Sequence, residues 1–297
     1  MRRESEDGAV DDGAMELLKR HIRDDYAGLF GVHDEEEVES VARRWFDESV
    51  NYDGRWSVLA AKRGARIGRV LDMAAGCGTF VLHGLREGHD VWGVEPEAWK
   101  QEFFRRKVAG GGYPAAYAAR IVEGIGERLP FEDGSFDVVT TFQTLEHVQD
   151  VGACLREMLR VLRPSGALYL RAPDYDSFYE PHYRLPFLPR MNKRLAASYL
   201  RALRRPTSGL ATLNWITRTS VEEGLRASGV DLRIQETAGD PSEQRARKLE
   251  CALPWLARRD ALKRAACTAL GVRARVLELR YLGRREKNID LWVERLA

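Results

Sequence analysis

The sequence predicts an α/β fold, a doubly wound and mostly parallel sheet with helices on both faces. The chain has 297 residues, of which 44% are hydrophobic, so it can bury a sizeable core. From residue 68 onward, short apolar runs alternate with helical segments, as expected of parallel strands buried on both sides. The first run, "VLDMAAGCGTF" at Val70–Phe80, passes from a strand into a turn of small residues, which is typical of a ligand-binding strand end.

The first predicted element is an N-terminal helical segment, residues 1–65. Its strings "AMELLKRHIRDDY" and "EEEVESVARRWFDESV" space apolar residues three and four positions apart, which predicts amphipathic helices. The segment has 10 basic and 16 acidic residues, a balance of 10 − 16 = −6. We therefore expect this end of the chain to be helical and acidic.

The second predicted element is the sheet domain, residues 66–297. Seven apolar runs are predicted as its strands: "GRVLDM", "HDVWGVEP", "AARIVEG", "FDVVTTF", "GALYLRAP", "VDLRIQET" and "KNIDLWVERL". Two insertions interrupt the alternation of strands and helices. Residues 174–217 are interpreted as a lid insertion after the fifth predicted strand, and the Arg-rich residues 241–285 have a helical pattern.

Composition narrows the class of protein. No apolar stretch approaches the ~20 residues of a membrane span, and the charged start "MRRESEDGAV" lacks the apolar core of a secretion signal. Four scattered cysteines show no metal-ligand spacing, so we expect a cytoplasmic protein with free thiols and no bound metal. The net charge is only +2 and no aromatic–basic module is apparent, so nucleic acid is not an expected partner.

The small residues of the first turn predict a ligand seat. Ala74, Ala75, Gly76 and Gly78 allow a sharp bend and a close approach of a ligand to the helix that follows. Tight packing of a helix on a strand also demands small residues, so the turn needs a second observation before it indicates a ligand.

Glu95 supplies that observation. It ends the second predicted strand in "VWGVEP", where an acid accepts hydrogen bonds from both ribose hydroxyls of a nucleoside. An exposed strand-end glutamate is the alternative. A dinucleotide site would need a third glycine where this chain has Val81, so the pattern favours a nucleoside without pyrophosphate.

Four blocks within residues 68–173 resemble, in order, the motifs of class I S-adenosylmethionine-dependent methyltransferases of the small-molecule group called type 11. The blocks are "VLDMAAGCGTF", "GVEP", "EGIGERLPFEDGSFDVVTTFQTLEHVQD" and "LREMLRVLRPSGALYLRAP". The resemblance implies a seven-stranded, Rossmann-like sheet with an antiparallel last strand. It also implies S-adenosylmethionine as methyl donor and, for most members, no metal requirement.

The resemblance further implies a set of cofactor-binding residues. Carried over position by position, the set is Asp72, Ala74, Gly76, Gly78, Glu95, Ile125, Gly126, Glu127 and Gln143. Two positions depart from the family pattern: Ala74 replaces the usual first glycine, and Ile125 replaces an Asp that would hold the adenine amino group. Adenine recognition would then depend on packing by Ile125 and on polar groups of Gly126 or Glu127.

Few catalytic residues are needed, because displacement at a sulfonium methyl requires alignment and only in some cases a general base. The candidate bases are His147, in "TLEHV", and His182, in "SFYEPHYRLPFLP", with a structural role as the alternative for each. The candidate acceptor-binding residues around His182 are Tyr175, Tyr179, Glu180 and Arg184. Glu146 and the two histidines could also be drawn as metal ligands, although their spacing is not diagnostic.

The lid insertion is basic. Residues 181–221 contain eight Lys or Arg and no acid, which predicts an anionic acceptor or peripheral contact with an anionic membrane. A solvated basic face is the alternative. Met191, Leu195, Tyr199 and Leu203 share one face of a helix predicted here. The insertion loosely resembles that of methyltransferases encoded among polysaccharide and glycoconjugate pathways.

The sequence thus predicts S-adenosylmethionine-dependent methyl transfer to a small-molecule or glycosyl acceptor, and the basic lid favours an anionic one. Two alternatives stay open. The departures at Ala74 and Ile125 allow a catalytically silent nucleoside-binding partner subunit. An NAD-dependent oxidoreductase is the other alternative, and the missing third glycine disfavours it.

Overall fold

The computed structural model describes residues 12–47, 54–64, 67–177, 179–188, 191–237 and 288–296. The helical insertion predicted at residues 241–285 lies outside the described residues.

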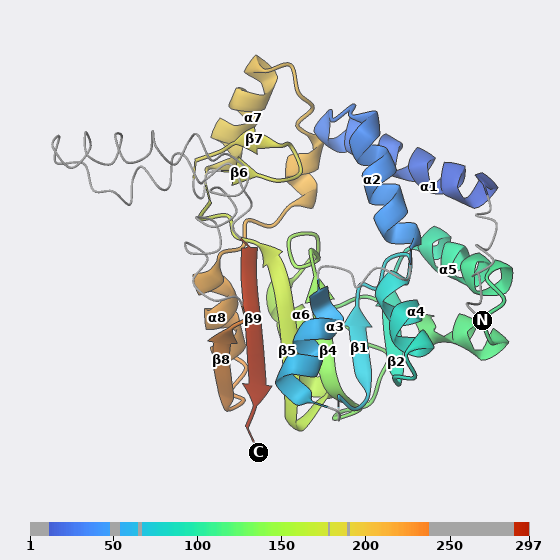
Figure 1. Ribbon diagram of the computed structural model, residues 1–297. Coiled ribbons are helices and arrows are strands. Elements are labelled where there is room, and N and C mark those ends of the chain that lie inside the picture. The colour runs from blue at the N-terminus through green and yellow to red at the C-terminus, as the bar shows by residue number, and fades with distance from the viewer. Residues whose placement is uncertain are drawn as a thin grey trace, which may run out of the picture.

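A seven-stranded sheet forms the centre of the molecule (Figure 1). Its strands are β1 (Val70–Met73), β2 (Val91–Glu95), β3 (Ile121–Glu123), β4 (Phe136–Phe142), β5 (Leu162–Pro173), β8 (Leu232–Glu236) and β9 (Asn288–Arg295). The spatial order is β3-β2-β1-β4-β5-β9-β8. Strands β1 to β5 pair in parallel, whereas β9 pairs antiparallel with β5 and β8. The seven predicted strands and the antiparallel last strand are confirmed.

The strand order reverses direction between β1 and β4, and this reversal locates the ligand crevice. In open α/β sheets, ligands bind outside the carboxyl ends of the strands at such a switch point. The predicted cofactor turn follows β1, and the loop carrying His147 follows β4. Both segments therefore lie at the same end of the sheet, beside the carboxyl ends of β1 and β4.

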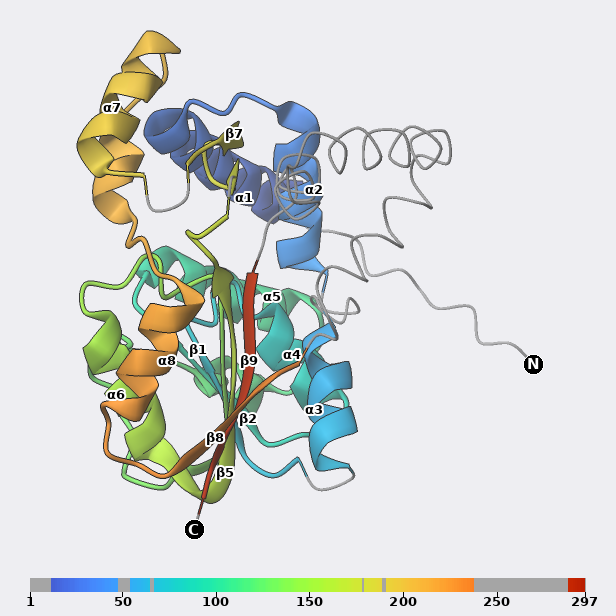
Figure 2. The ribbon, with the colours of Figure 1, turned by 90° about the vertical axis from the view of Figure 1, so that its left-hand side faces the viewer.

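Helices cover both faces of the sheet, as Figure 2 shows. One face carries α6 (Val151–Val161) and α8 (Arg218–Arg226), and the other carries α3 (Arg55–Arg63), α4 (Thr79–Arg86) and α5 (Ala98–Gly110). A 3₁₀ helix, η3 (Ala115–Arg120), precedes β3. The packed apolar residues include Leu155 of α6, Leu59 of α3 and Phe104 of α5, all buried. The doubly wound architecture is thus confirmed.

The N-terminal helices lie beyond the carboxyl ends of the strands (Figure 1). Helix α1 (Asp12–Asp25) continues into a π-helical turn, η1 (Tyr26–Phe30), and α2 (Glu35–Phe46) follows. Asp34 caps α2, because its side chain accepts the Glu37 N–H at 3.2 Å. The apolar stripes of α1 and α2 are buried together with two residues of the sheet domain, Cys77 and Phe103. These helices therefore cover the turn after β1, whereas α3 packs on the sheet itself. The predicted boundary at residue 65 stays a prediction.

The lid insertion consists of a short hairpin and two helices. They are β6 (Tyr179–Glu180), β7 (Leu185–Pro186), α7 (Lys193–Ala202) and the 3₁₀ helix η4 (Ser208–Thr212). Its core is shared with the N-terminal segment, since Phe30 and Val32 pack in one cluster with Tyr183, Leu200 and Leu210. The lid is therefore packed against the N-terminal helices.

The apolar face predicted for α7 is only partly buried. Leu195 and Leu203 are 53% and 45% exposed, whereas Ala196 and Leu200 are buried. The helix buries its Ala196–Leu200 pair against the lid core, because those residues also stand four positions apart. Leu195 and Leu203 face outward, whereas Met191 and Tyr199 of the predicted face are partly buried against the lid core.

Candidate active site

The turn after β1 holds three residues in the left-handed region, Ala74, Gly76 and Gly78, with φ of 64°, 58° and 76°. A Cβ added at Gly78 would lie 2.2 Å from Phe104, so packing of α5 explains this glycine. A Cβ added at Gly76 would meet none of the described atoms within 4 Å, so this glycine borders open space. Ala74 adopts a left-handed conformation that costs a residue with a Cβ about 1–2 kcal/mol.

Glu95 lies directly beside this turn. Its Oε2 accepts the Gly76 N–H at 2.8 Å, and its Oε1 accepts the Glu97 N–H at 3.1 Å. The side chain is 3% exposed, and burial raises the pKa of its carboxyl, an effect that Lys100 Nζ, 3.8 Å away, opposes. The two features that predict a nucleoside site therefore meet in space. Contact between Glu95 and a ribose stays a prediction.

The candidate adenine residues have different surroundings. Ile125 is 47% exposed, so its side chain is available for packing on a ring. Gly126 is buried, and a Cβ there would lie 2.8 Å from Cys154 Sγ. Glu127 accepts the N–H groups of Gln149 and Asp150 at 2.7 and 3.2 Å, so its carboxylate orders the chain entering α6. Their roles toward adenine stay predictions.

Asp72 is placed inside the sheet. Its Oδ1 accepts hydrogen bonds from Arg55 Nη1 at 2.8 Å and Thr140 Oγ1 at 2.9 Å. Desolvation raises the pKa of the carboxyl, while Arg55 opposes the shift. The residue is 1% exposed, so we infer that it acts on the cofactor turn through β1. A direct cofactor contact by Asp72 stays a prediction.

Gln143 directly follows β4 in a left-handed conformation, with φ of 53°. Its N–H donates to the Arg171 oxygen at 2.9 Å, and its Nε2 lies 3.4 Å from Asn288 Oδ1. The residue therefore ties the end of β4 to β5 and β9. The predicted contact with the methionine part of the cofactor is not tested by these bonds.

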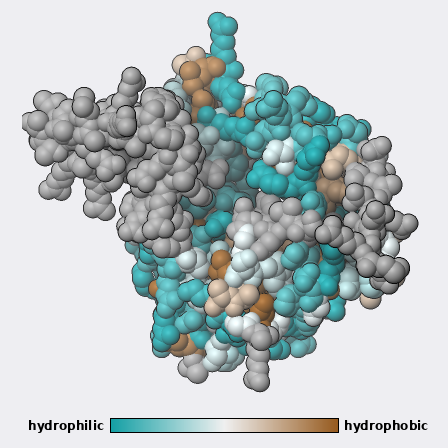
Figure 3. Space-filling view, in the orientation of Figure 1, coloured by the Kyte–Doolittle hydropathy of each residue, from teal (hydrophilic) through white to brown (hydrophobic). Residues whose placement is uncertain are grey.

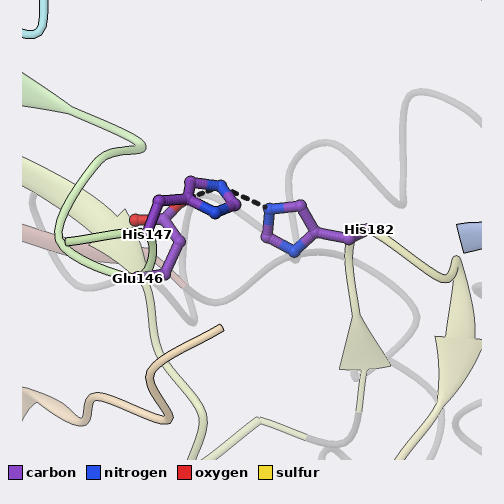
Figure 4. Close-up of side chains that lie close together, drawn as sticks. All are labelled: Glu146, His147 and His182. Carbon is purple, nitrogen blue, oxygen red and sulfur yellow. Dashed lines mark hydrogen bonds and ion pairs between the residues drawn. The ribbon is translucent and has the colours of Figure 1, made fainter. Parts of the chain in front are cut away.

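The two candidate histidines meet, as Figure 4 shows. His147 comes from the loop after β4 and His182 from the β6–β7 turn, and their Nε2 atoms lie 3.2 Å apart. Although the His147 side chain is 40% exposed, the surrounding protein, together with the neighbouring His182, lowers the pKa of its imidazole to about 4. The pair thus joins the lid to the loop that follows β4.

Glu180 organises the lid hairpin. Its Oε1 lies 2.8 Å from His182 Nδ1 and accepts the Tyr175 hydroxyl at 3.2 Å, and its Oε2 accepts the Tyr183 N–H at 2.5 Å. The carboxylate is 1% exposed. Glu180 therefore orients His182, and Tyr175 in turn holds Glu180. Tyr179 is half-buried in β6. Acceptor contact by these three residues stays a prediction.

Asn214 was missed by the sequence interpretation. Its N–H donates to the Glu146 oxygen at 2.6 Å, and its side-chain amide donates to the main-chain oxygens of Leu145 and Val148. These bonds fix the loop that carries Glu146 and His147. The string "LNWIT" contains the residue, but its partners lie 66 to 69 residues earlier, so no local pattern indicated the contact.

Arg184, a predicted acceptor-binding residue, pairs with the N-terminal segment. Its Nη2 lies 2.7 Å from Glu37 Oε1, and its Nη1 lies 3.5 Å from Asp34 Oδ2. Arg205 also donates to the main-chain oxygens of Gly31 and Tyr183. Arg184 is therefore neutralised by acids of the N-terminal segment and Arg205 is held by main-chain oxygens, so part of the basic lid has partners within the chain.

Comparisons with known proteins agree with this fold. Residues 71–170 match a family model described as "Methyltransferase domain". An uncharacterized methyltransferase of Mycobacterium sp. (strain KMS) is 38% identical over 101 residues, covering 34% of this chain and 37% of the relative. A ubiquinone biosynthesis O-methyltransferase of Photorhabdus laumondii is 25% identical over 202 residues, covering 63% of this chain and 80% of the relative.

A solved structure gives the same fold. Phosphoethanolamine N-methyltransferase 2 of Haemonchus contortus, in complex with S-adenosyl-L-methionine, is 14% identical with a TM-score of 0.53. The alignment covers 92% of this chain and 59% of that chain.

The sheet order and the family match identify a methyltransferase domain of the class I fold at residues 71–170. The family match assigns residues 71–170 to the methyltransferase domain family, and the Haemonchus contortus enzyme, solved with S-adenosyl-L-methionine, shares the fold of this chain. The chain spans just over a third of the length of the first relatives it matches, at 37%. Within the described residues, no helix is long and apolar enough to cross a membrane.

Proposed function

We propose that this chain transfers the methyl group of S-adenosylmethionine to a small-molecule or glycosyl acceptor bound under the lid. The contact between Glu95 and Gly76 at 2.8 Å carries the proposal, because it brings the predicted ribose acid to the predicted cofactor turn. In this arrangement α1 and α2 cover the cofactor end, and the lid hairpin covers the acceptor end. Both covers exclude water from the reacting atoms.

The reaction needs an aligned nucleophile and a place for its proton. Glu180 holds the Nδ1–H of His182, which leaves Nε2 of a neutral ring as the proton acceptor. In this proposal the acceptor oxygen or nitrogen attacks the sulfonium methyl carbon while the carbon–sulfur bond breaks toward sulfur. The products are the methylated acceptor and S-adenosylhomocysteine.

The acceptor is proposed to be anionic or presented at an anionic surface. Arg194 and Arg201 are exposed on α7 beside Leu195, and the exposed Leu203 and Arg204 directly follow the helix. Figure 3 shows a hydrophobic patch on α7 within a mostly hydrophilic surface. A basic and apolar helix face of this kind suits peripheral contact with anionic lipids. The relative named for ubiquinone biosynthesis supports a hydroxyl-bearing acceptor of quinone biosynthesis as a second candidate.

Acceptor-dependent formation of S-adenosylhomocysteine tests the proposed function. The purified full chain is incubated with S-adenosylmethionine and with two acceptor panels, anionic sugars and catechol-type phenols, and the product is measured by mass spectrometry. We expect turnover with one panel. Binding of S-adenosylmethionine without turnover on either panel would instead support a silent partner subunit.

His182→Ala tests the acceptor side of the site. We expect turnover to fall more than cofactor affinity, because the residue stands at the lid and away from the β1 turn. His89→Ala is the matched control. His89 lies just before β2 and stacks on Trp56 of α3, so it belongs to neither the lid nor the β1 turn. A normal rate in His182→Ala would leave this histidine a structural role.

A further inference from the structure

We propose that His147, His182 and Glu146 bind one divalent transition-metal ion on the acceptor side of the site. This inference rests on the proposed methyl transfer and deepens it, because it assigns activation of the acceptor to a bound ion in place of proton transfer to His182. It also departs from the sequence-based expectation that the protein binds no metal.

The positions of the donor atoms support a shared ion. Two ligands held at about 2.0–2.1 Å by a tetrahedral metal lie about 3.3–3.4 Å apart. The two histidine Nε2 atoms are separated by 3.2 Å. Glu146 Oε1 lies 3.9 Å from His147 Nε2, and one donor atom from each of the three residues falls within 4.8 Å of the others. Small side-chain rotations would bring all three onto one ion.

The hydrogen bonds of the far ring atoms orient the two imidazoles. His182 Nδ1 lies 2.8 Å from the Glu180 carboxylate, and His147 Nδ1 lies 3.4 Å from the Thr212 main-chain oxygen. Both partners are acceptors, so a proton on each Nδ1 satisfies them and would leave each neutral ring with its Nε2 lone pair directed at the other. Two facing lone pairs repel unless a cation stands between them. A histidine held by a carboxylate or carbonyl at its far nitrogen is the usual arrangement of a metal ligand.

The ligand set indicates the kind of ion. Imidazole suits zinc, iron and other transition metals, whereas magnesium and calcium prefer oxygen ligands. Two histidines and one glutamate leave at least one coordination position open, as in catalytic zinc sites. Glu146 is fully buried, so its carboxylate would offset the charge of the ion inside the protein.

An ion here would act on an acceptor hydroxyl. Coordination lowers the pKa of a bound hydroxyl, so its proton leaves to solvent water. The oxygen then attacks the methyl carbon, a carbon–oxygen bond forms, and the carbon–sulfur electrons pass to sulfur. Under this proposal the histidines hold the ion and do not themselves take the proton.

Metal titration of the full chain tests the site. The protein is purified without a histidine tag and stripped with chelator, then titrated with Zn²⁺ by calorimetry and with Co²⁺ by visible absorption. We expect one Zn²⁺ per chain, a Co²⁺ spectrum of low coordination number, and much weaker binding of Mg²⁺. His147→Ala should weaken Zn²⁺ binding at least tenfold, and it should fold normally because the side chain is 40% exposed. His182→Asn should have the same effect.

The controls separate this site from other histidines. His83 and His89 both lie against Trp56, so a double His83→Ala, His89→Ala variant tests a second histidine pair and should bind Zn²⁺ unchanged. Equal Zn²⁺ affinity in the full chain and in His147→Ala would overturn the proposal and leave a proton between the rings as the explanation. Binding of S-adenosylmethionine by the stripped chain is measured separately, because its absence would count against the proposed function and not against the metal site.

Discussion

Glu95 is the residue on which cofactor recognition depends most. Replacing it by Gln should weaken S-adenosylmethionine binding tenfold or more, about 1.4 kcal/mol, because an amide accepts the two ribose hydroxyls poorly. The measurement is calorimetric titration. Glu123→Gln is the control, because Glu123 stands opposite Glu95 in the β2–β3 register and is exposed. Equal affinities in the two variants would remove the ribose assignment.

The same residue predicts the pH dependence of binding. Burial raises the pKa of Glu95, and only the ionised carboxylate can accept hydrogen bonds from both ribose hydroxyls. Cofactor affinity should therefore be complete above this raised pKa and be lost as the pH falls through it, at a higher pH than an ordinary glutamate would give. Titrations across an acidic pH series check this, and the Glu95→Gln profile should be flat over the same interval.

At the scale of elements, the pair Arg55–Asp72 joins α3 to β1. The Arg55 guanidinium lies between the rings of Phe80 and Phe142, 4.3 and 4.4 Å from their centroids. Arg55→Met should lower the free energy of unfolding by about 3–5 kcal/mol, because it leaves the buried Asp72 carboxylate without this cation. Urea denaturation measures the loss.

Two further variants test whether the loss of stability in Arg55→Met comes from the unpaired Asp72 carboxylate. Adding Asp72→Asn to Arg55→Met should recover most of the stability, because no buried charge remains. Arg233→Met is the control, since its pair with Glu294 is exposed and worth at most about 1 kcal/mol. A loss in Arg55→Met no larger than in Arg233→Met would mean that the buried pair contributes little.

At the scale of the whole molecule, the sheet was predictable and the contacts between distant segments were not. Strands such as β1 are buried along their whole length, so each leaves a continuous apolar run in the sequence. The His147–His182 contact joins residues 35 positions apart, and Arg184 meets Asp34 across 150 positions. Such pairs leave no periodic pattern. Sequence therefore supplied the candidate residues, while only the fold brought them together.

The docking of the lid on the N-terminal helices can be tested by charge reversal. Arg184→Glu should repel Glu37 and speed hydrogen exchange in residues 179–186 and at the start of α2. The free energy of local opening should fall by at most about 1 kcal/mol, because the pair is partly exposed. Adding Glu37→Arg should restore protection. Exchange that stays fast in the double variant would show that Arg184 acts through other contacts.

The two glycines of the β1 turn have a consequence for mutagenesis. A methyl group at position 78 collides with Phe104, whereas one at position 76 enters vacant volume. Lost cofactor uptake after Gly78→Ala thus reports a displaced helix, not a blocked cleft. Only the Gly76→Ala exchange probes how much room the nucleoside requires, and its left-handed backbone means that unfolding must be recorded alongside.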